Sequence, residues 1–263
     1  MKRAVVAILL ALATPTLAAD TARQILDRRK ALEDGERHWT DRHQHLSFKI
    51  LDSRGGTRTR ELDVYEKRYP GDERKAIVFF RSPPEVKGTA FLAFNHKGKP
   101  AEQWLYLPEL QRVRQITANT RNQSFVGTDL TYHDLDLLTD MISWTEDDAA
   151  SRLRGEESVD GVACHAIELT PKREDIGYAK VVLWLGTSDL VPRKIEFYED
   201  GAEPKKRIVQ SEIHTIGKIP VADLTKVESP GAGTSTEIRT GETHFDANLA
   251  DDGFTQRALE QAP

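Results

Sequence analysis

Four short apolar runs between residues 76 and 116, separated by turn-forming residues, constrain the fold of this chain most strongly. The runs are AIVFFR (76–81), TAFLAF (89–94), EQWLYL (102–107) and RVRQI (112–116). Proline, glycine and asparagine separate them, and the first three runs each contain two aromatic side chains. Runs of this length and composition are typical of neighbouring antiparallel strands. The sequence therefore predicts a meander of strands in this region.

Both faces of these predicted strands are apolar. Side chains alternate across a strand, so Phe91 and Ala93 point to one face. Leu92 and Phe94 point to the other face. An antiparallel sheet with one face in water would instead alternate apolar and polar residues. Something must therefore cover the second face: the protein's own helices, or these helices together with a bound apolar ligand.

The rest of the chain predicts further strands and a few helices. Apolar residues at helical spacing occur at 21–38 and 134–142, and a short helix is expected in the tail at 249–259. Further strand-like runs occupy residues 46–51, 58–69, 151–159, 162–169, 178–185, 193–199, 207–216 and 237–245. About ten strands with mostly adjacent connections predict a mainly antiparallel β-barrel, open or closed.

Several motifs resemble one bacterial family. They include F-x-x-P-P-x-V-K-G-T-A-F-L (80–92), QWLYLPELQRVR (103–114), SFVGTDLTYHDL (124–135), VDGVACHAIELTP (159–171), YAKVVLWL (178–185) and PRKIEFYEDG (192–201). Their order resembles that of the LolA-like group of periplasmic proteins, known as outer-membrane lipoprotein-sorting proteins. This resemblance implies an open half-barrel of antiparallel strands whose concave face is covered by helices, as in LolA and LolB.

The N-terminus has the pattern of a secretory signal. Lys2 and Arg3 precede an apolar run and a small-residue cleavage site, so residues 1–19 are expected to be removed. The formal net charge of −5 would then become −7, which argues against a nucleic-acid partner. Cys164 is the sole cysteine, so the cleavage site lacks a residue for a lipid anchor. We therefore expect a periplasmic protein with one domain, residues 20–263.

The aromatic residues of the strand-rich region are candidates for a lipid-binding cavity. The candidate lining residues are Phe79, Phe91, Phe94, Trp104, Tyr106, Phe125, Leu138 and Trp144. Most of them would form ordinary core in a protein without a ligand. One alternate set, Phe91 with Trp104 and Tyr106, would line the cavity in a carrier. The loops Pro83–Gly88 and Asn119–Gly127 are expected to form its rim and to move most.

Other polar groups suggest sites that their context does not support. His43 and His45 would share one face of a strand, but no third ligand accompanies them at a spacing typical of zinc. Ser124, Asp129 and His133 lie within ten residues, whereas a nucleophile relay is normally assembled by the fold from distant segments. We therefore expect no catalytic residues, no metal and no cofactor.

Three functional classes remain, and the resemblance favours the first. It implies a non-enzymatic carrier that binds acyl chains of lipoproteins or other lipids and moves them between the inner and outer membranes. The partners would be an inner-membrane transporter of the RND (MMPL-like) or ABC type and an outer-membrane acceptor. The alternative is a scaffolding or protein-binding module of the envelope with a filled core. A secreted hydrolase has the least support.

Overall fold

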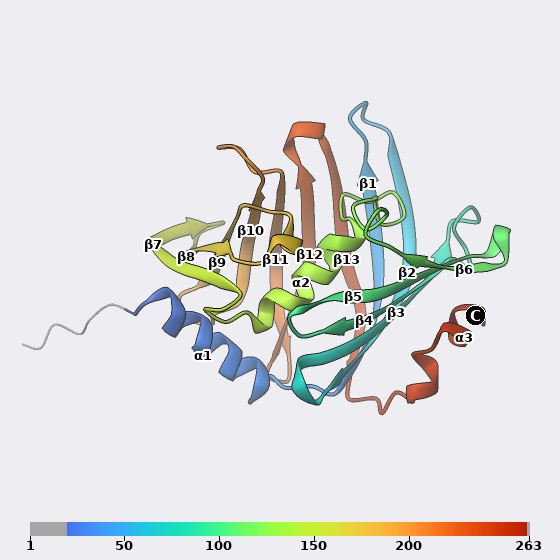
Figure 1. The fold of residues 1–263 in the computed structure, drawn as a ribbon, viewed down its shortest axis with the longest axis horizontal. Coiled ribbons are helices and arrows are strands. Elements are labelled where there is room, and N and C mark those ends of the chain that lie inside the picture. The colour runs from blue at the N-terminus through green and yellow to red at the C-terminus, as the bar shows by residue number, and fades with distance from the viewer. Residues whose placement is uncertain (1–19, 262–263) are drawn as a thin grey trace, which may run out of the picture.

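The computed structural model describes residues 20–261 of the chain (Figure 1). The expected signal peptide, residues 1–19, lies outside this range. Between residues 20 and 261, no helix has both the length and the apolar composition needed to cross a membrane.

In the described part of the chain, thirteen antiparallel strands form one continuous curved sheet (Figure 1). The strands are β1 (Asp41–Leu51), β2 (Thr57–Tyr69), β3 (Glu73–Ser82), β4 (Ala90–His96), β5 (Lys99–Leu107), β6 (Arg112–Ile116), β7 (Ala149–Val159), β8 (Val162–Pro171), β9 (Lys180–Gly186), β10 (Pro192–Tyr198), β11 (Lys206–Ile216), β12 (Ile219–Ser229) and β13 (Thr234–Phe245). Their order in the sheet is β6-β5-β4-β3-β2-β1-β13-β12-β11-β10-β9-β8-β7. The prediction of an open antiparallel half-barrel is confirmed.

The first strand lies in the middle of this sheet, and the chain then forms one half of the sheet before the other. Strands β1 to β6 lead outward to one edge, and residues 117–148 then cross to the opposite edge, where β7 begins. Strands β7 to β13 lead back to the centre, where β13 pairs with β1 and places Ile238 opposite Phe48. The crossing segment must therefore pass over one face of the sheet.

Among residues 20–261, three α-helices flank the sheet. Helix α1 (Ala22–Asp34) begins at a capping box formed by Thr21 and Gln24, and it ends four residues before the predicted limit of 38. Helix α2 (Tyr132–Asp140) lies in the crossing segment and continues into a 3-10 turn, so the predicted helix at 134–142 is confirmed. Helix α3 (Gln256–Leu259) is the short tail helix. Figure 1 shows α1 and α2 on one face of the sheet and α3 beyond the other.

Both faces of the β3–β5 region are covered, as their double apolar pattern predicted. On the concave face, Phe91 packs in a cluster with Phe80 and with Phe125 of the crossing segment. On the convex face, Leu92 and Trp104 pack against the C-terminal segment through its Phe254. The second face is therefore covered by the protein's own tail.

The proposed set of Phe91, Trp104 and Tyr106 does not share one face, so that expectation is wrong. The β4–β5 register pairs Phe91 with Leu105 and Leu92 with Trp104. Directly opposed residues of an antiparallel pair point to the same face, so Trp104 and Tyr106 lie on the convex side. Phe91 lies on the concave side.

Strand β12 was not predicted. Pro220 near its start is typical of a chain break, but proline is tolerated at the beginning of a strand. Gly217, with a φ of 61°, provides the tight turn that joins β11 to β12. The strand pairs with β11 on one side and β13 on the other, and it contributes the buried Val221 and Val227.

Candidate functional site

Helix α2 lies across the concave face and is held at its start by a buried charge cluster. Asp134 is fully buried, and its carboxylate accepts hydrogen bonds from Lys206 of β11, from the Tyr178 hydroxyl at 2.7 Å and from the Thr131 backbone N–H at 2.6 Å. Burial alone would raise the pKa of Asp134, but Lys206 and Tyr178 outweigh it and hold the pKa below its ordinary value. This helix start is therefore fixed to the β9–β11 half of the sheet.

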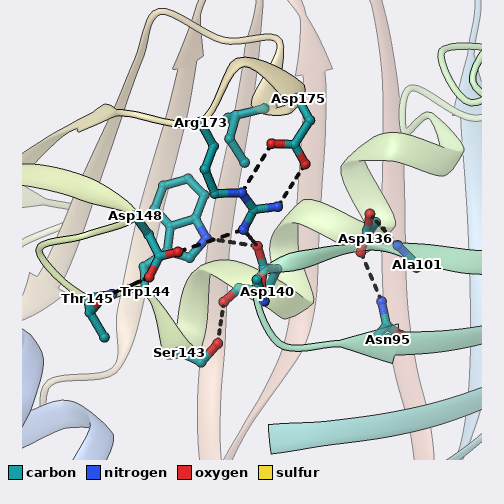
Figure 2. A network of polar contacts seen from close by, with 12 residues as sticks. Asn95, Ala101, Asp136, Asp140, Ser143, Trp144, Thr145, Asp148, Arg173 and Asp175 are labelled. Atoms are coloured by element: carbon teal, nitrogen blue, oxygen red, sulfur yellow. Dashed lines mark hydrogen bonds and ion pairs between the residues drawn. The ribbon is translucent and has the colours of Figure 1, made fainter.

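The end of α2 is held by a second ionic network (Figure 2). The guanidinium of Arg173 donates to Asp140 at 2.7 Å and forms a two-pronged pair with Asp175, at 3.1 and 2.7 Å. Asp140 also accepts from Trp144 Nε1 at 3.0 Å and from the Gly98 backbone N–H at 3.1 Å. Asp175 and Asp140 together raise the pKa of Arg173. This network joins α2 to the β8–β9 connection and to the β4–β5 hairpin.

The middle of α2 contacts the β4–β5 hairpin as well. Asp136 accepts from Asn95 Nδ2 at 3.3 Å and from the Ala101 backbone N–H at 3.0 Å (Figure 2). Burial raises the pKa of Asp136, and the nearby Asp140 raises it further, whereas the hydrogen bonds from Ala101 and Asn95 lower it. Helix α2 is thus attached by side-chain contacts to both halves of the sheet.

Two apolar cavities lie beneath the helix on its two sides. One, of about 220 Å³, lies over β1–β5 and is lined by Leu46, Phe48, Leu62, Val64, Val78, Phe91, Phe125 and Leu135, among others. The other, of about 260 Å³, lies over β9–β13 and is lined by Leu138, Leu183, Ile195, Ile208 and Val227, among others. Both are also lined by Leu130 and Ile238, so α2 divides one groove into two parts.

A third cavity of about 260 Å³ adjoins the other two and is polar. It shares Leu138 with the β9–β13 cavity and Arg42 with the β1–β5 cavity. Glu66 accepts from Arg42 at 2.5 Å and lies 3.5 Å from Arg74. Burial alone would raise the pKa of Glu66, but the two arginines outweigh it and lower the pKa. At one end, the groove therefore adjoins a cavity lined by charged side chains.

The structure divides the predicted lining residues between several places. Phe91 and Phe125 line the β1–β5 cavity, and Leu138 lines the β9–β13 cavity. Trp144 lies at the end of α2 beside a much smaller space next to α1. Four residues lie on the convex face: Phe79, Phe94, Trp104 and Tyr106. Phe79 there lines a separate cavity of about 290 Å³ under the tail.

Sequence reasoning missed the aliphatic half of the groove. Ile195, Ile208, Val227 and Ile238 come from β10 to β13 and line the β9–β13 cavity. The alternation of apolar and polar residues in these strands could have identified them as residues of the covered face. The predicted lining residues are instead mostly aromatic side chains of β3–β5.

The predicted rim loops both pack on the concave cluster. Pro83–Gly88 contributes Val86, and Asn119–Gly127 contributes Phe125 and Val126. Their expected motion stays a prediction.

The three polar residues considered for a nucleophile relay each contact a different group. Ser124 Oγ donates to the Thr128 carbonyl at 2.6 Å, Asp129 accepts from the Thr236 hydroxyl at 2.8 Å, and His133 Nε2 lies 2.6 Å from the Ile176 carbonyl. These contacts direct the three side chains to different partners instead of to one another.

The two histidines of β1 lie away from the groove. His43 stacks on Tyr65 with ring centroids 4.3 Å apart, and His45 contacts the carboxylates of Asp63 and Glu61 at 3.0 Å each. Within residues 20–261, no group of three or more histidine, cysteine or acidic side chains is arranged to hold a metal ion.

Known proteins with this architecture include envelope proteins. A family model described as an uncharacterized protein matches residues 72–261. A structure described as an outer membrane lipoprotein-sorting protein domain, from Vibrio parahaemolyticus, is 27% identical over 91% of this chain and 98% of that chain, with a TM-score of 0.81. A DUF1329 family protein from Desulfovibrio piger is 26% identical over 92% of this chain and 100% of that chain, with a TM-score of 0.82.

A more distant structure shares the fold. A LolA superfamily protein from Nitrosomonas europaea is 19% identical over 91% of this chain and 100% of that chain, with a TM-score of 0.68. A search of curated proteins gave no match.

Proposed function

The chain belongs to the LolA-like family of outer-membrane lipoprotein-sorting proteins, and on this premise we propose that it is a periplasmic carrier of acyl chains. The acyl chain would be held in the groove under α2, and the carrier would move it between the inner and outer membranes. The observation that carries the proposal is the pair of apolar cavities on the two sides of helix α2.

The size of the cavities fits partial burial of a chain. Each cavity is smaller than the roughly 300–1,000 Å³ of a typical ligand pocket, but the two together fall within that range. Each buried methylene contributes about 0.8 kcal/mol, so complete burial of a long chain would bind cargo too tightly for rapid release. A groove that accepts only part of an acyl chain binds it weakly enough for a transport protein to release it.

Helix α2 is suited to act as a movable cover. Leu135 faces the β1–β5 cavity and Leu138 faces the β9–β13 cavity, so outward movement of the helix would join the two spaces. Its ion pairs with Lys206 and Arg173 would exchange protein partners for water during this movement. The helix would cover the groove when cargo is absent and yield to the acyl chain when cargo is present.

The partners follow from the proposed transport. An inner-membrane transporter of the RND or ABC type would load the carrier, and an outer-membrane acceptor would unload it. The alternative is an envelope scaffold in which the same cavities are only packing defects. Extraction of the purified protein with organic solvent, followed by mass spectrometry, tests the proposal directly, because a carrier is expected to retain lipid.

Filling the groove is expected to weaken acyl binding without unfolding the protein. Ile238 lines both cavities, so Ile238→Trp would place an indole where the acyl chain would lie. Exclusion of two or more methylenes costs about 1.6 kcal/mol or more, and we therefore expect the Kd for a fluorescent C16 fatty acid to rise at least about tenfold. The melting temperature should stay within a few degrees, because the cavities accept the added volume.

Arg239→Trp is the matched control. Arg239 is the next residue of β13 and is directed to the opposite, exposed face. The control variant should bind the fluorescent ligand like the wild type. Equal binding by the Ile238→Trp variant and the wild type would favour the scaffold alternative.

A further inference from the structure

Arg29 occupies a position on α1 that the helix otherwise uses for apolar residues. Ala22 and Ile25 are buried against the sheet, Leu32 packs against the same cluster, and Arg29 lies between them at helical spacing. The side chain lines the apolar β9–β13 cavity, where it is the only charged lining residue from the described part of the chain. An arginine facing an apolar cavity loses hydration, so its position requires a compensating interaction.

The guanidinium of Arg29 has no hydrogen bond or ion pair to residues 20–261, and its Nε is shielded from solvent without a hydrogen-bond partner. Burial lowers its pKa, and the nearby Arg74 and Arg37 lower it further. Glu33 opposes this effect by longer-range attraction, without forming an ion pair. The side chain as a whole is half-buried, and only its Nε is fully shielded from solvent. A shielded donor without a partner destabilises a fold unless something else compensates for it.

The surroundings of Arg29 add to its positive charge. Among the described residues, the charged side chains that line the three joined cavities are Arg29, Arg42, Arg68, Arg74, Glu33 and Glu66. Glu66 contacts both Arg42 and Arg74, and Arg68 stacks over Trp39 at 4.6 Å. The groove therefore has an excess of two positive charges, whereas the whole chain has a net charge of −5.

We propose that Arg29 binds the oxyanion head of an acidic lipid, a carboxylate or a phosphate, whose acyl chain occupies the groove under α2. This inference rests on the proposed carrier function and specifies its cargo. The guanidinium offers several N–H donors in a geometry that suits such oxyanions. A lipid whose acyl chains are joined to an uncharged head lacks this oxyanion. Arg29 therefore selects acidic lipids over neutral ones.

The test compares two ligands with the same tail. Palmitate and monopalmitoylglycerol would each displace a neutral fluorescent acyl probe from the purified protein. We expect the wild type to bind palmitate about tenfold tighter or more, the scale of a hydrogen bond to a charged group. Arg29→Met should bind both ligands with similar Kd values, and Arg29→Lys should recover part of the preference. The melting temperature of Arg29→Met should equal or exceed that of the wild type.

Arg28→Met is the matched control. Arg28 is the neighbouring residue on α1, is exposed, and pairs with Asp20 at the surface. This variant should keep the wild-type preference for palmitate. Acetate and inorganic phosphate alone, at the same concentration, should displace no probe, because they lack the tail.

Three results would overturn the inference. The first is a wild type that does not distinguish the two C16 ligands, and the second is an Arg29→Met variant that still prefers palmitate. The third is displacement by acetate or phosphate as effective as by palmitate, which would identify a site for free anions. Failure of both C16 ligands to bind the wild type would instead reject the carrier function on which the inference rests.

Discussion

Replacement of Lys206 with methionine is expected to lower the free energy of unfolding by about 3–5 kcal/mol, the usual effect of leaving a buried charge without its partner. Asp134 has 0% exposure and Lys206 5%, so water cannot replace the lost ammonium group. Methionine keeps most of the volume of the lysine stem, and the loss of packing should therefore be small. Chemical denaturation monitored by tryptophan fluorescence measures the change.

A double-mutant cycle isolates the pair from its surroundings. Asp134→Asn alone leaves Lys206 buried without an anion and should also destabilise the protein strongly. The variant with both substitutions should lose less stability than the sum of the two single losses, because neither buried charge remains. A loss of under about 1 kcal/mol in Lys206→Met, typical of an exposed ion pair, would contradict this account of the α2 attachment.

The same pair predicts a dependence of stability on pH. The folded-state pKa of Asp134 lies below the unfolded value of about 3.9. Its contribution is therefore fully present above the unfolded pKa and is lost as the pH falls through the folded pKa. The stability difference between the wild type and Lys206→Met should narrow over that acidic range. A constant difference from pH 7 to pH 3 would show that Asp134 does not titrate as the pair requires.

Replacement of Arg173 with methionine is expected to release the other end of α2. Asp140 keeps its hydrogen bonds from Trp144 and Gly98, so the loss of stability should be about 1.5–3 kcal/mol, the range for hydrogen bonds to charged groups. If α2 covers the groove, a larger open fraction makes more protein competent to bind. We therefore expect faster association of a fluorescent C16 fatty acid and faster amide exchange in α2.

Arg152→Met is the control for this prediction. Arg152 forms an ion pair with Glu168 at 3.0 Å, but its side chain is 69% exposed, and such surface pairs contribute little. Its stability and its ligand association should match the wild type. Unchanged exchange in α2 of the Arg173→Met variant would show that the network of Figure 2 does not restrain the helix.

Local patterns in the sequence were sufficient for most strands and for the architecture. The runs bounded by proline, glycine and asparagine became β3 to β6, and the double apolar pattern of β4 correctly required a cover on both faces. Pro220 concealed β12, because a proline at the start of a strand looks the same in sequence as a proline in a loop.

The candidate site required information that no local pattern contains. Alternation within β4 and within β5 gives the relative directions of neighbours in each strand, but not which residues of the two strands share a face. That depends on the register, which pairs Phe91 with Leu105 and not with Trp104. The contact between Asp134 and Lys206 spans 72 residues, and helical spacing alone did not mark Arg29 as facing a cavity.

The pairing of the first strand with the last has a consequence for how the polypeptide acquires its structure. Strand β1 finds its partner on one side, β2, within a hairpin, but its other neighbour is β13, from the far end of the chain. Contacts so distant in sequence form late and make folding slow. Until β1 and β13 pair, each of these two strands presents unpaired backbone groups to which a strand of another molecule could add. The seam at the centre of the sheet is therefore the place where nascent molecules are most exposed to aggregation.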